Sequence, residues 1–218
     1  MSTTVPSYQQ GLQALRDQLA DMLPAAQLAI FNADATQQGV DIPRDLPVKV
    51  GDHAPLFSLP DANGNAVALA DLLQQGKVVL TFYRGVWCPY CNLELRNLQA
   101  ILPQIHAVGA SVVAISAMKP DFSATIASQN ELTFTVLSDM DTAVASQYTN
   151  VIQNPQTSTQ AMADLGYDFY AFYDNQSGNL PVPATFVIDQ QGKILFAESQ
   201  GGDYRERVEP QAILDALA

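Results

Sequence analysis

Hydrophobic and polar residues follow two different periods along the chain, and the change of period predicts a mixed α/β fold. Short β-branched and aromatic runs are typical of buried strands, and they occupy residues 78–83, 111–116, 134–137, 182–189 and 194–198. Between them, apolar residues recur every three or four positions, as they do in helices that bury one face. These helices are predicted at residues 70–75, 121–129, 141–148 and 210–217, and from the cysteine motif at 88–91 to Gly109.

The first 47 residues precede this pattern and form a segment of their own. Leucines keep helical spacing there, at Leu12, Leu15, Leu19 and Leu23. Pro24 marks the start of a second helix that reaches Ala35. We expect residues 1–47 to be an accessory pair of amphipathic helices packed on the main domain. An arm that binds a partner or a second copy of the chain is the alternative.

Residues 48–218 are predicted to form the main domain, which opens with a hairpin around the Asn63-Gly64 turn. Within it, residues 149–180 break the regular alternation. This stretch crowds aromatic side chains together, at Tyr167, Phe169, Tyr170, Phe172 and Tyr173. We interpret it as an insertion that covers the active site or forms an interface, such as that of a homodimer, with simple core packing as the alternative.

The chain has two cysteines, Cys88 and Cys91, and they follow the predicted strand at 78–83. Pro89 suits the first position of a helix, where no backbone N–H is needed. Cys88 would then be the N-cap, facing unpaired N–H groups and the positive end of the helix dipole, so we expect a lowered pKa for its thiol. Cys91 is expected to be more buried and to close a disulfide with an oxidised Cys88. A strand–helix–strand unit places this redox centre at the C-terminal edge of a sheet.

A cysteine pair of this spacing can instead be half of a zinc site that histidines complete. His106 lies on the same predicted helix as Cys91 but fifteen residues later, and therefore about 22 Å away. His53 lies in an extended segment before Ala54-Pro55 and is expected to be a structural or surface residue. We therefore expect neither a metal nor another cofactor.

The charge of the chain limits its partners. The 10 basic and 22 acidic residues give a net charge of −12, which disfavours nucleic acid and anionic membranes. No apolar run approaches the roughly 20 residues that cross a membrane. The start of the sequence lacks the basic and then apolar pattern of a signal peptide. We expect a cytoplasmic protein.

Three motifs, in this order, resemble the AhpC/TSA peroxiredoxin-like group of the thioredoxin superfamily. They are V-G-D-H-A-P-L-F-S-L-P-D-A-N-G from residue 50, F-Y-R-G-V-W-C-P-Y-C from residue 82 and V-P-A-T-F-V-I-D from residue 182. The resemblance spans about residues 48–218. It implies a thioredoxin-like three-layer α/β/α fold with a central mixed β-sheet. It also implies that Pro183 is a cis-proline facing the active cysteine.

Three positions distinguish the chain from the peroxiredoxins that it otherwise resembles. Thr81 and Gly85 stand where those enzymes have a proline and a threonine before the reactive cysteine. Pro183 stands where they have an arginine that polarises the peroxide. The Cys-Pro-Tyr-Cys motif with a cis-proline is also similar to thioredoxin, glutaredoxin and TlpA-type reductases.

Side chains around the cysteines have predicted roles of their own. Arg84 lies in the loop before the motif and could donate hydrogen bonds to a thiolate or a bound peroxide. An exposed loop arginine is the alternative. Trp87 is expected to shield the sulfur from water, and Tyr90 to tune its exposure. Glu94 and Arg96 are expected on solvated faces of the helix.

These residues support two enzyme hypotheses, of which we favour the first. A peroxiredoxin-like thiol peroxidase would oxidise Cys88 to a sulfenic acid with a hydroperoxide and resolve it with Cys91, and a thioredoxin- or glutathione-type reductant would restore the pair. A thiol–disulfide oxidoreductase would use the same pair on protein or glutathione disulfides. A redox sensor without fast turnover is a third hypothesis. The predicted catalytic residues are Cys88, Cys91, Arg84, Trp87 and Pro183.

Overall fold

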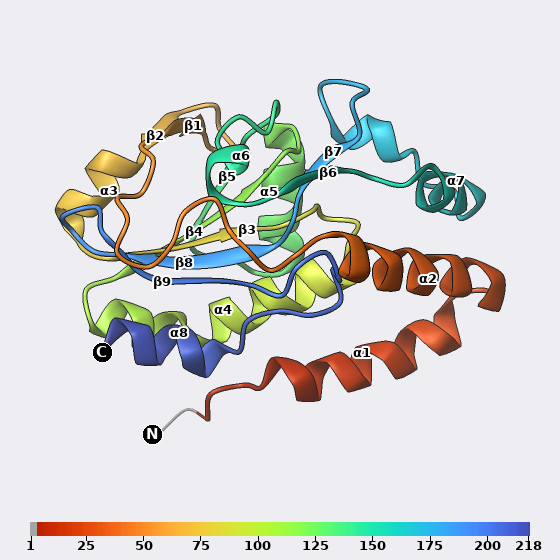
Figure 1. Cartoon of the computed structure of the whole chain (residues 1–218), viewed down its shortest axis with the longest axis horizontal. Coiled ribbons are helices and arrows are strands. Elements are labelled where there is room, and N and C mark those ends of the chain that lie inside the picture. The colour runs from red at the N-terminus through yellow and green to blue at the C-terminus, as the bar shows by residue number, and fades with distance from the viewer. Residues whose placement is uncertain (1–3) are drawn as a thin grey trace.

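The computed structural model describes residues 4–218 and has a five-stranded mixed sheet at its centre (Figure 1). Its strands are β3 (Val78–Phe82), β4 (Ser111–Ser116), β5 (Thr135–Ser138), β8 (Ala184–Ile188) and β9 (Ile194–Ser199). They lie in the order β5-β4-β3-β8-β9. Strands β3, β4 and β5 are parallel, whereas β8 is antiparallel to both β3 and β9. The predicted central mixed sheet is confirmed.

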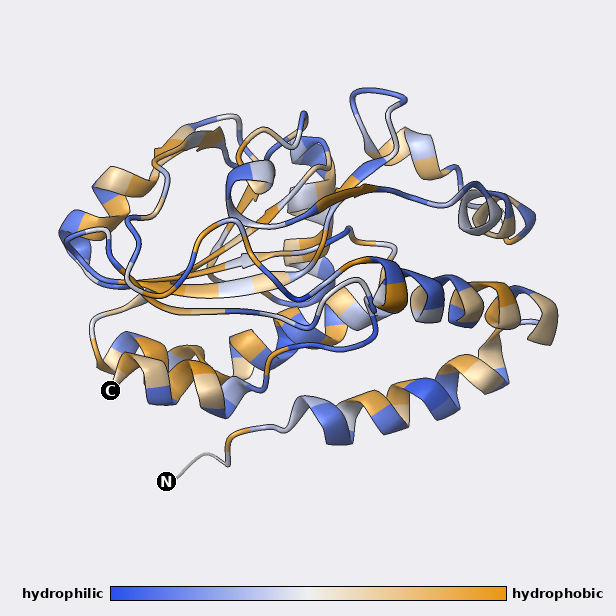
Figure 2. Ribbon diagram, in the orientation of Figure 1, coloured by the Kyte–Doolittle hydropathy of each residue, from blue (hydrophilic) through white to orange (hydrophobic). Residues whose placement is uncertain are grey.

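Helices cover both faces of this sheet, which confirms the predicted three-layer arrangement. One face is covered by α4 (Pro89–Ala107), α5 (Pro120–Gln129) and α8 (Pro210–Leu217), and the other by α3 (Leu69–Gln75) and α6 (Ala145–Tyr148). Because side chains alternate along a strand, Leu80 and Phe82 of β3 pack on the α3 side, while Val79 and Thr81 face α4. Figure 2 shows apolar residues concentrated in the sheet and on the helix faces next to it.

Two helix starts differ from their prediction. α5 begins one residue before the predicted 121–129, because its N-cap is Lys119 and Pro120 is its first residue, which leaves Asp121 in the first turn. α6 is shorter than the predicted 141–148 and begins at Ala145. The Asp139 carboxylate explains this start, because it accepts a hydrogen bond from the Ala145 N–H at 2.7 Å and so takes the role of a cap.

Two small antiparallel sheets lie outside the central one. They are the predicted hairpin of β1 (Ser58–Pro60) and β2 (Ala66–Ala68), and the pair of β6 (Val151–Gln153) and β7 (Asn179–Pro181). Between β6 and β7 the chain forms a helix, α7 (Gln156–Asp164), and a short 3-10 helix, η1 (Phe169–Phe172). These elements occupy the stretch at about 149–180 that the sequence predicts to be an insertion.

The helices predicted for the N-terminal segment are present as α1 (Tyr8–Met22) and α2 (Ala25–Asp41). α1 packs against α4, and α2 packs against α7 (Figure 1). The Glu209 carboxylate, just before α8, accepts a hydrogen bond from the Tyr8 N–H at 2.9 Å and so satisfies a donor of the first turn of α1. The Tyr204 hydroxyl donates to the Phe31 carbonyl in α2 at 2.7 Å. Residues 203–209 therefore fix both accessory helices to the main domain.

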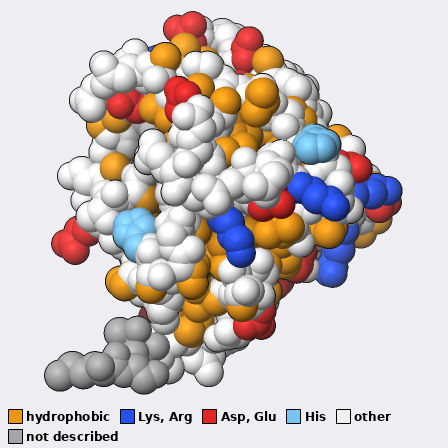
Figure 3. Space-filling model, turned by 90° about the vertical axis from the view of Figure 1, so that its left-hand side faces the viewer, with side chains coloured by type: hydrophobic (Ala, Val, Ile, Leu, Met, Phe, Trp, Pro, Cys, Tyr) orange, Lys and Arg blue, Asp and Glu red, His pale blue; other side chains and the backbone are white. Residues whose placement is uncertain are grey.

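The surface of the molecule carries both histidines. His53 and His106 are exposed, and Figure 3 shows the two histidines well apart on one face. Both cysteines are buried. Within residues 4–218, no three His, Cys, Asp or Glu side chains come together in a group that could hold a metal ion. None of the helices described for residues 4–218 combines the length and the apolar composition of a membrane-spanning segment.

Candidate active site

The cysteine motif lies at the junction of β3 and α4. Cys88 is the N-cap of α4 with Pro89 in the first turn, as predicted, and its backbone is extended at φ −88° and ψ 111°. The Cys88 N–H donates to the Gly85 carbonyl at 3.1 Å, which closes the turn after β3. Gly85 is required in this turn because a Cβ there would lie 2.5 Å from Trp87 Nε1. The turn therefore folds the Trp87 ring back beside the motif.

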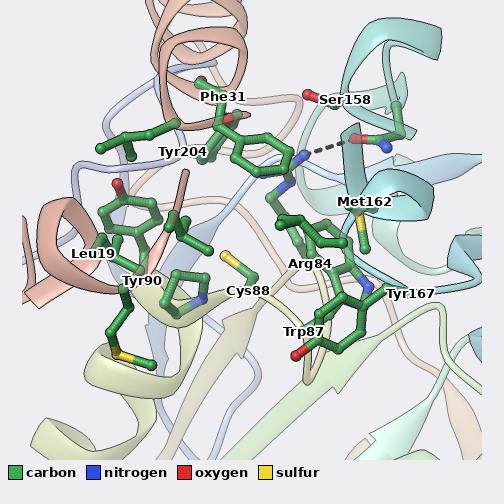
Figure 4. Close-up of a pocket in the computed structure, with 16 residues that line it drawn as sticks. Leu19, Phe31, Arg84, Trp87, Cys88, Tyr90, Ser158, Met162, Tyr167 and Tyr204 are labelled. Atoms are coloured by element: carbon green, nitrogen blue, oxygen red, sulfur yellow. Dashed lines mark hydrogen bonds between the residues drawn. The ribbon is translucent and has the colours of Figure 1, made fainter. Parts of the chain in front are cut away.

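Cys88 lines a pocket of about 240 Å³ (Figure 4). One wall comes from α1 and α2, and the opposite wall comes from α7 and the loop that follows it. The lining is mostly apolar and includes Leu19, Leu28, Phe31, Met162, Leu165 and Tyr167. Only 1% of Cys88 is exposed. A reactant must therefore enter this pocket to reach the sulfur.

Arg84 lines the same pocket and is buried, so the alternative of an exposed loop arginine is wrong. Its guanidinium carbon lies 3.8 Å from the centre of the Tyr204 ring and 5.0 Å from that of Trp87, which are cation–π distances. Nη2 donates to Asn154 Oδ1 at 2.9 Å, the bond drawn in Figure 4. Nε is buried without a hydrogen-bond partner among the described residues. A buried donor without an acceptor is costly, so this N–H is an unused hydrogen-bond donor of a residue that lines the pocket.

The aromatic residues between β6 and β7 pack on the motif. Trp87 Nε1 donates to the Tyr173 hydroxyl at 3.0 Å, and that hydroxyl donates to the Arg84 carbonyl at 3.2 Å. The Phe169 ring meets Trp87 edge-on, with the ring centres 5.6 Å apart. These contacts favour the interpretation that the segment covers the site, while Phe169 and Tyr173 also belong to the core. A role as an interface stays a prediction.

Cys91 is fully buried, and its sulfur accepts hydrogen bonds from two N–H donors. Arg207 Nη2 donates at 3.2 Å, and the Arg84 backbone N–H donates at 3.4 Å. Burial alone would raise the pKa of Cys91, but the hydrogen bond from Cys88, the charge of Arg207 and the Arg84 N–H lower it well below the usual range. Burial and the hydrogen bond to Cys91 raise the pKa of Cys88 well above the usual range.

The predicted low pKa of Cys88 is therefore wrong. A helix N-terminus favours a thiolate where the sulfur meets free N–H groups, and Cys88 makes no such side-chain bond. The structure stabilises the negative charge of the pair three residues later, at Cys91. The expectation that Cys91 is the more buried cysteine holds narrowly, with 0% exposed against 1%.

Glu94 and Arg207 form a buried ion pair beside Cys91. Arg207 Nε lies 2.7 Å from Glu94 Oε2, with only 2% and 6% of the two side chains exposed. Burial raises the pKa of Glu94 to about 7, although Arg207 opposes this rise. The expectation that Glu94 lies on a solvated face is wrong, whereas Arg96 is exposed as expected. Glu94 follows Cys91 by three residues on the same helix face, and this spacing is the sequence signal for its burial.

Arg207 and Tyr204 were not found by sequence-based prediction. Arg207 lies 116 residues after Cys91, and no periodic pattern connects the two. The one available signal is that Arg205 and Arg207 stand close together, next to an aromatic residue, in a chain with 10 basic residues. That signal does not say which element such a cluster will contact.

Comparison with known proteins decides the family. The AhpC/TSA family model matches residues 50–197, which is more than half of the chain. The chain belongs to the AhpC/TSA family. Its relatives include the putative peroxiredoxin Rv2521 of Mycobacterium tuberculosis, 32% identical over 148 residues that cover 68% of this chain and 83% of the relative. Peroxiredoxin Bcp of Escherichia coli (strain K12) is 37% identical over 102 residues, which cover 47% of this chain and 65% of Bcp.

A solved structure supports the same assignment. The crystal structure of peroxidoxin BcpB from Mycobacterium tuberculosis matches with a TM-score of 0.60 at 27% identity, covering 78% of this chain and 96% of that one. The thiol-disulfide oxidoreductase ResA of Bacillus thuringiensis is 24% identical over 163 residues, which cover 74% of this chain and 76% of ResA. The expected thioredoxin-like fold is confirmed, and this AhpC/TSA protein is a peroxiredoxin-like oxidoreductase.

Pro183 differs from its prediction in this AhpC/TSA protein. No peptide bond within residues 4–218 is cis, and Pro183 does not line the pocket. The chain runs from β7 through Val182 into β8, with the Val182 N–H donating to the Asn150 carbonyl at 2.8 Å. The Pro183 carbonyl accepts a bond from Ser199 Oγ at 2.8 Å. A trans proline fits this extended entry to a strand, so the expectation of a cis-proline at the active cysteine is wrong.

Proposed function

We propose that this AhpC/TSA protein is a thiol peroxidase that reduces small, apolar organic hydroperoxides. The pocket carries this proposal, because its reactive group is Cys88 and its walls are mostly apolar. Its volume of about 240 Å³ lies below the roughly 300–1,000 Å³ of sites for drug-sized ligands, which suits a smaller molecule. An apolar substituent on the peroxide would gain binding free energy in proportion to the area that it removes from water.

The proposed reaction uses both cysteines. The Cys88 thiolate attacks the terminal oxygen of the hydroperoxide ROOH, the O–O bond breaks, Cys88 becomes a sulfenic acid, and RO⁻ takes up a proton to leave as an alcohol. Cys91 then attacks the Cys88 sulfur, which closes the disulfide and releases hydroxide that is protonated to water. A thioredoxin- or glutathione-type reductant returns both cysteines to thiols.

Arg84 is the residue that we assign to the peroxide. Arg84 lines the pocket together with Cys88, its buried Nε has no hydrogen-bond partner among the described residues, and its bond to Asn154 and its stacking on Tyr204 fix the guanidinium in place. A fixed cation beside the reacting oxygens stabilises the charge that forms as the O–O bond breaks. Arg84 would thus take the role of the arginine that peroxiredoxins carry at the position of Pro183. Trp87 would keep water away from the sulfur.

The second candidate function is that of a thiol–disulfide oxidoreductase. The Cys-Pro-Tyr-Cys motif and the similarity to ResA favour it. That reaction needs a protein or glutathione disulfide to bring a sulfur into bonding distance of Cys88. The cover of α1, α2 and α7 over Cys88 supports the peroxidase instead, because a small hydroperoxide fits into the pocket. The same cover favours a small thiol as reductant unless α1 or α7 moves on oxidation.

We also propose that the protein works in the cytoplasm, because both cysteines must be kept reduced between turnovers and that compartment keeps thiols reduced. A homodimer stays a prediction that the oligomeric state in solution will decide.

Stopped-flow fluorescence tests the peroxidase directly, since Trp87 is the single tryptophan of the chain and precedes Cys88. The reduced protein is mixed with cumene hydroperoxide and, separately, with hydrogen peroxide. We expect a fast fluorescence change with cumene hydroperoxide, a slower one with hydrogen peroxide, and none in Cys88→Ser. A rate no higher than that of a free thiol, together with rapid reaction with oxidised glutathione, would transfer the assignment to the oxidoreductase.

A further inference from the structure

The two sulfurs of the motif differ in what can hold a negative charge. Cys91 Sγ accepts hydrogen bonds from Arg207 Nη2 at 3.2 Å and from the Arg84 N–H at 3.4 Å. Within residues 4–218, the Cys88 sulfur accepts no hydrogen bond from any N–H group and contacts no guanidinium in this way. Because donors and cations stabilise a thiolate, the single negative charge of the reduced pair belongs on Cys91.

Arg207 is held so that it points at this sulfur. Its Nε donates to Glu94 Oε2 at 2.7 Å, and its Nη1 donates to the Glu206 carbonyl at 2.7 Å and to the Tyr204 carbonyl. Only 2% of the side chain is exposed. These bonds fix the plane of the guanidinium and leave Nη2 to contact Cys91.

The charge of Arg207 is shared between two acids. Burial raises the pKa of Glu94 to about 7, and the nearby Cys91 adds to this rise while Arg207 opposes it. A carboxyl with a raised pKa gives up its proton less readily, so the Cys91 thiolate shares the positive charge of Arg207 with Glu94. Arg84 is a second cation beside the sulfur. The other titratable groups nearby have pKa values raised by burial and are uncharged: Tyr8, Tyr83 and Tyr173.

We propose that Arg207 is a positioning residue that keeps the resting thiolate on Cys91, and that this thiolate is the base that activates Cys88. This inference rests on the proposed peroxidase function and adds to it the route by which the proton leaves Cys88. The substrate enters on the side of Cys88, whereas the charge is held on the side of Cys91, so a proton must pass between the two sulfurs before Cys88 reacts.

Each step balances. The Cys91 thiolate accepts the proton of the Cys88 thiol, and the Cys88 thiolate attacks ROOH. The O–O bond breaks to leave a sulfenic acid on Cys88 and RO⁻, which takes the proton back from the Cys91 thiol and departs as ROH. Cys91 is again a thiolate beside Arg207. It attacks the Cys88 sulfur, the disulfide forms, and the hydroxide released takes a proton from solvent.

Ultraviolet absorbance of the thiolate tests this assignment in the reduced protein without any peroxide. Cys88→Ser leaves Cys91 as the one thiol, and Cys91→Ser leaves Cys88. We expect Cys88→Ser to show a thiolate across the neutral range, and Cys91→Ser to show one only above the ordinary cysteine pKa of about 8.5. The opposite pattern, with a neutral-pH thiolate in Cys91→Ser alone, overturns the proposal.

Variants of the ion pair, made in the Cys88→Ser background, test Arg207 itself. Arg207→Gln is expected to raise the titration midpoint of Cys91 by about one pH unit or more, a tenfold loss of thiolate below the midpoint, and Arg207→Lys to restore part of it. Glu94→Gln is expected to lower the midpoint, because it removes the anion that competes for Arg207. A general loosening of the site would move both glutamine variants in the same direction, and that result overturns the role of Arg207.

The outcomes separate this inference from the function on which it rests. A wild-type protein that reacts with cumene hydroperoxide no faster than a free thiol, but whose Cys88→Ser variant keeps the neutral-pH thiolate, would refute the peroxidase and retain the charge assignment. A fast reaction of the wild type with cumene hydroperoxide, together with a neutral-pH thiolate in Cys91→Ser alone, would retain the peroxidase and refute the charge assignment. Where Arg207→Gln fails to fold, as circular dichroism would show, the comparison of the two serine variants still decides.

Discussion

The two sides of the cysteine motif differ more than its short spacing suggests. On the Cys88 side lies an apolar pocket, walled by the accessory helices α1 and α2 and by α7. On the Cys91 side lies a buried cluster of charged and polar groups, built around Arg207 and Glu94. About one turn of helix therefore separates Cys88, which lines the pocket, from Cys91, whose sulfur is placed to hold a negative charge. The difference divides binding and proton transfer between two residues that a sequence motif presents as equivalent.

Replacing each cysteine in turn is expected to have the largest effect on activity, because each variant removes one of the two roles. With cumene hydroperoxide and dithiothreitol, Cys88→Ser is expected to lose turnover by at least about a thousandfold, because it removes the nucleophile. In the absence of dithiothreitol, which would itself reduce a sulfenic acid, Cys91→Ser is expected to react with peroxide slowly and then stop as a sulfenic acid, which dimedone labels and mass spectrometry detects. Undiminished turnover in Cys88→Ser would contradict the assignment of the reactive sulfur.

The Glu94→Gln variant tests the charged side of the motif through the pH dependence of folding stability. Burial raises the pKa of Glu94 from its ordinary 4.5 to about 7 in the folded protein. The folded state thus binds this proton more tightly than the unfolded state, and the stability it contributes is full below about 4.5 and lost as the pH rises through about 7. The rise corresponds to on the order of 3 kcal/mol of unfolding free energy.

Urea unfolding of the reduced protein at about pH 4.5 and about pH 8 measures this change. We expect the wild type to lose on the order of 3 kcal/mol more than Glu94→Gln across this interval. Glu206→Gln is the matched control, since Glu206 forms an ion pair with Arg16 whose side chains are 31% and 43% exposed. The same pH dependence in wild type and Glu94→Gln would show that Glu94 is ionised in the fold throughout.

The Arg84→Met variant tests the pocket side of the motif. Methionine keeps an unbranched side chain beside Tyr204 but removes the hydrogen-bond donors of the guanidinium. We expect the oxidation of Cys88 by cumene hydroperoxide to slow by about a hundredfold, as the loss of one fixed donor to a developing oxyanion does in other enzymes. Trp87 fluorescence follows the rate. Arg96→Met removes an exposed arginine from α4 and serves as control. Equal rates in the two variants would remove Arg84 from the reaction.

The smallest expected effect concerns substrate preference. Leu28 lines the pocket from α2, so Leu28→Gln is expected to lower the rate with cumene hydroperoxide by about fivefold, or about 1 kcal/mol, through lost apolar contact. The rate with hydrogen peroxide is expected to stay the same. Val40→Gln changes a residue of the same helix that is 76% exposed and should alter neither rate. A parallel loss with both peroxides would mean that the wall does not select the substrate.

Local sequence was sufficient to predict the central strands and the helix that Cys88 starts. The run at 78–83 and the apolar repeat after Cys91 each fix their element through neighbours in the chain. Proline in the first turn of α4 is a local signal as well. Such signals gave the fold and the position of the motif, because both depend on interactions over a few residues.

The charges around the motif were not predicted, because contacts distant in sequence decide them. The prediction of a lowered pKa for Cys88 took only its own helix into account. Arg207, from the segment before α8, instead favours the negative charge on Cys91. Burial of Arg84 likewise depends on Tyr204 and Asn154, which no local pattern connects to it. Pro183 was assigned from a resemblance, and the straight path from β7 into β8 requires no cis peptide bond there.

The segment from 203 to 209 has a consequence for selectivity by size. Tyr204 and Glu209 tie α2 and α1 to the main domain, and the two helices form one wall above Cys88. We expect this wall to exclude bulky molecules sterically, without binding any of them. Under the proposed function, the cysteine pair would then be shielded from bulky protein disulfides and would react with peroxides small enough to enter the pocket.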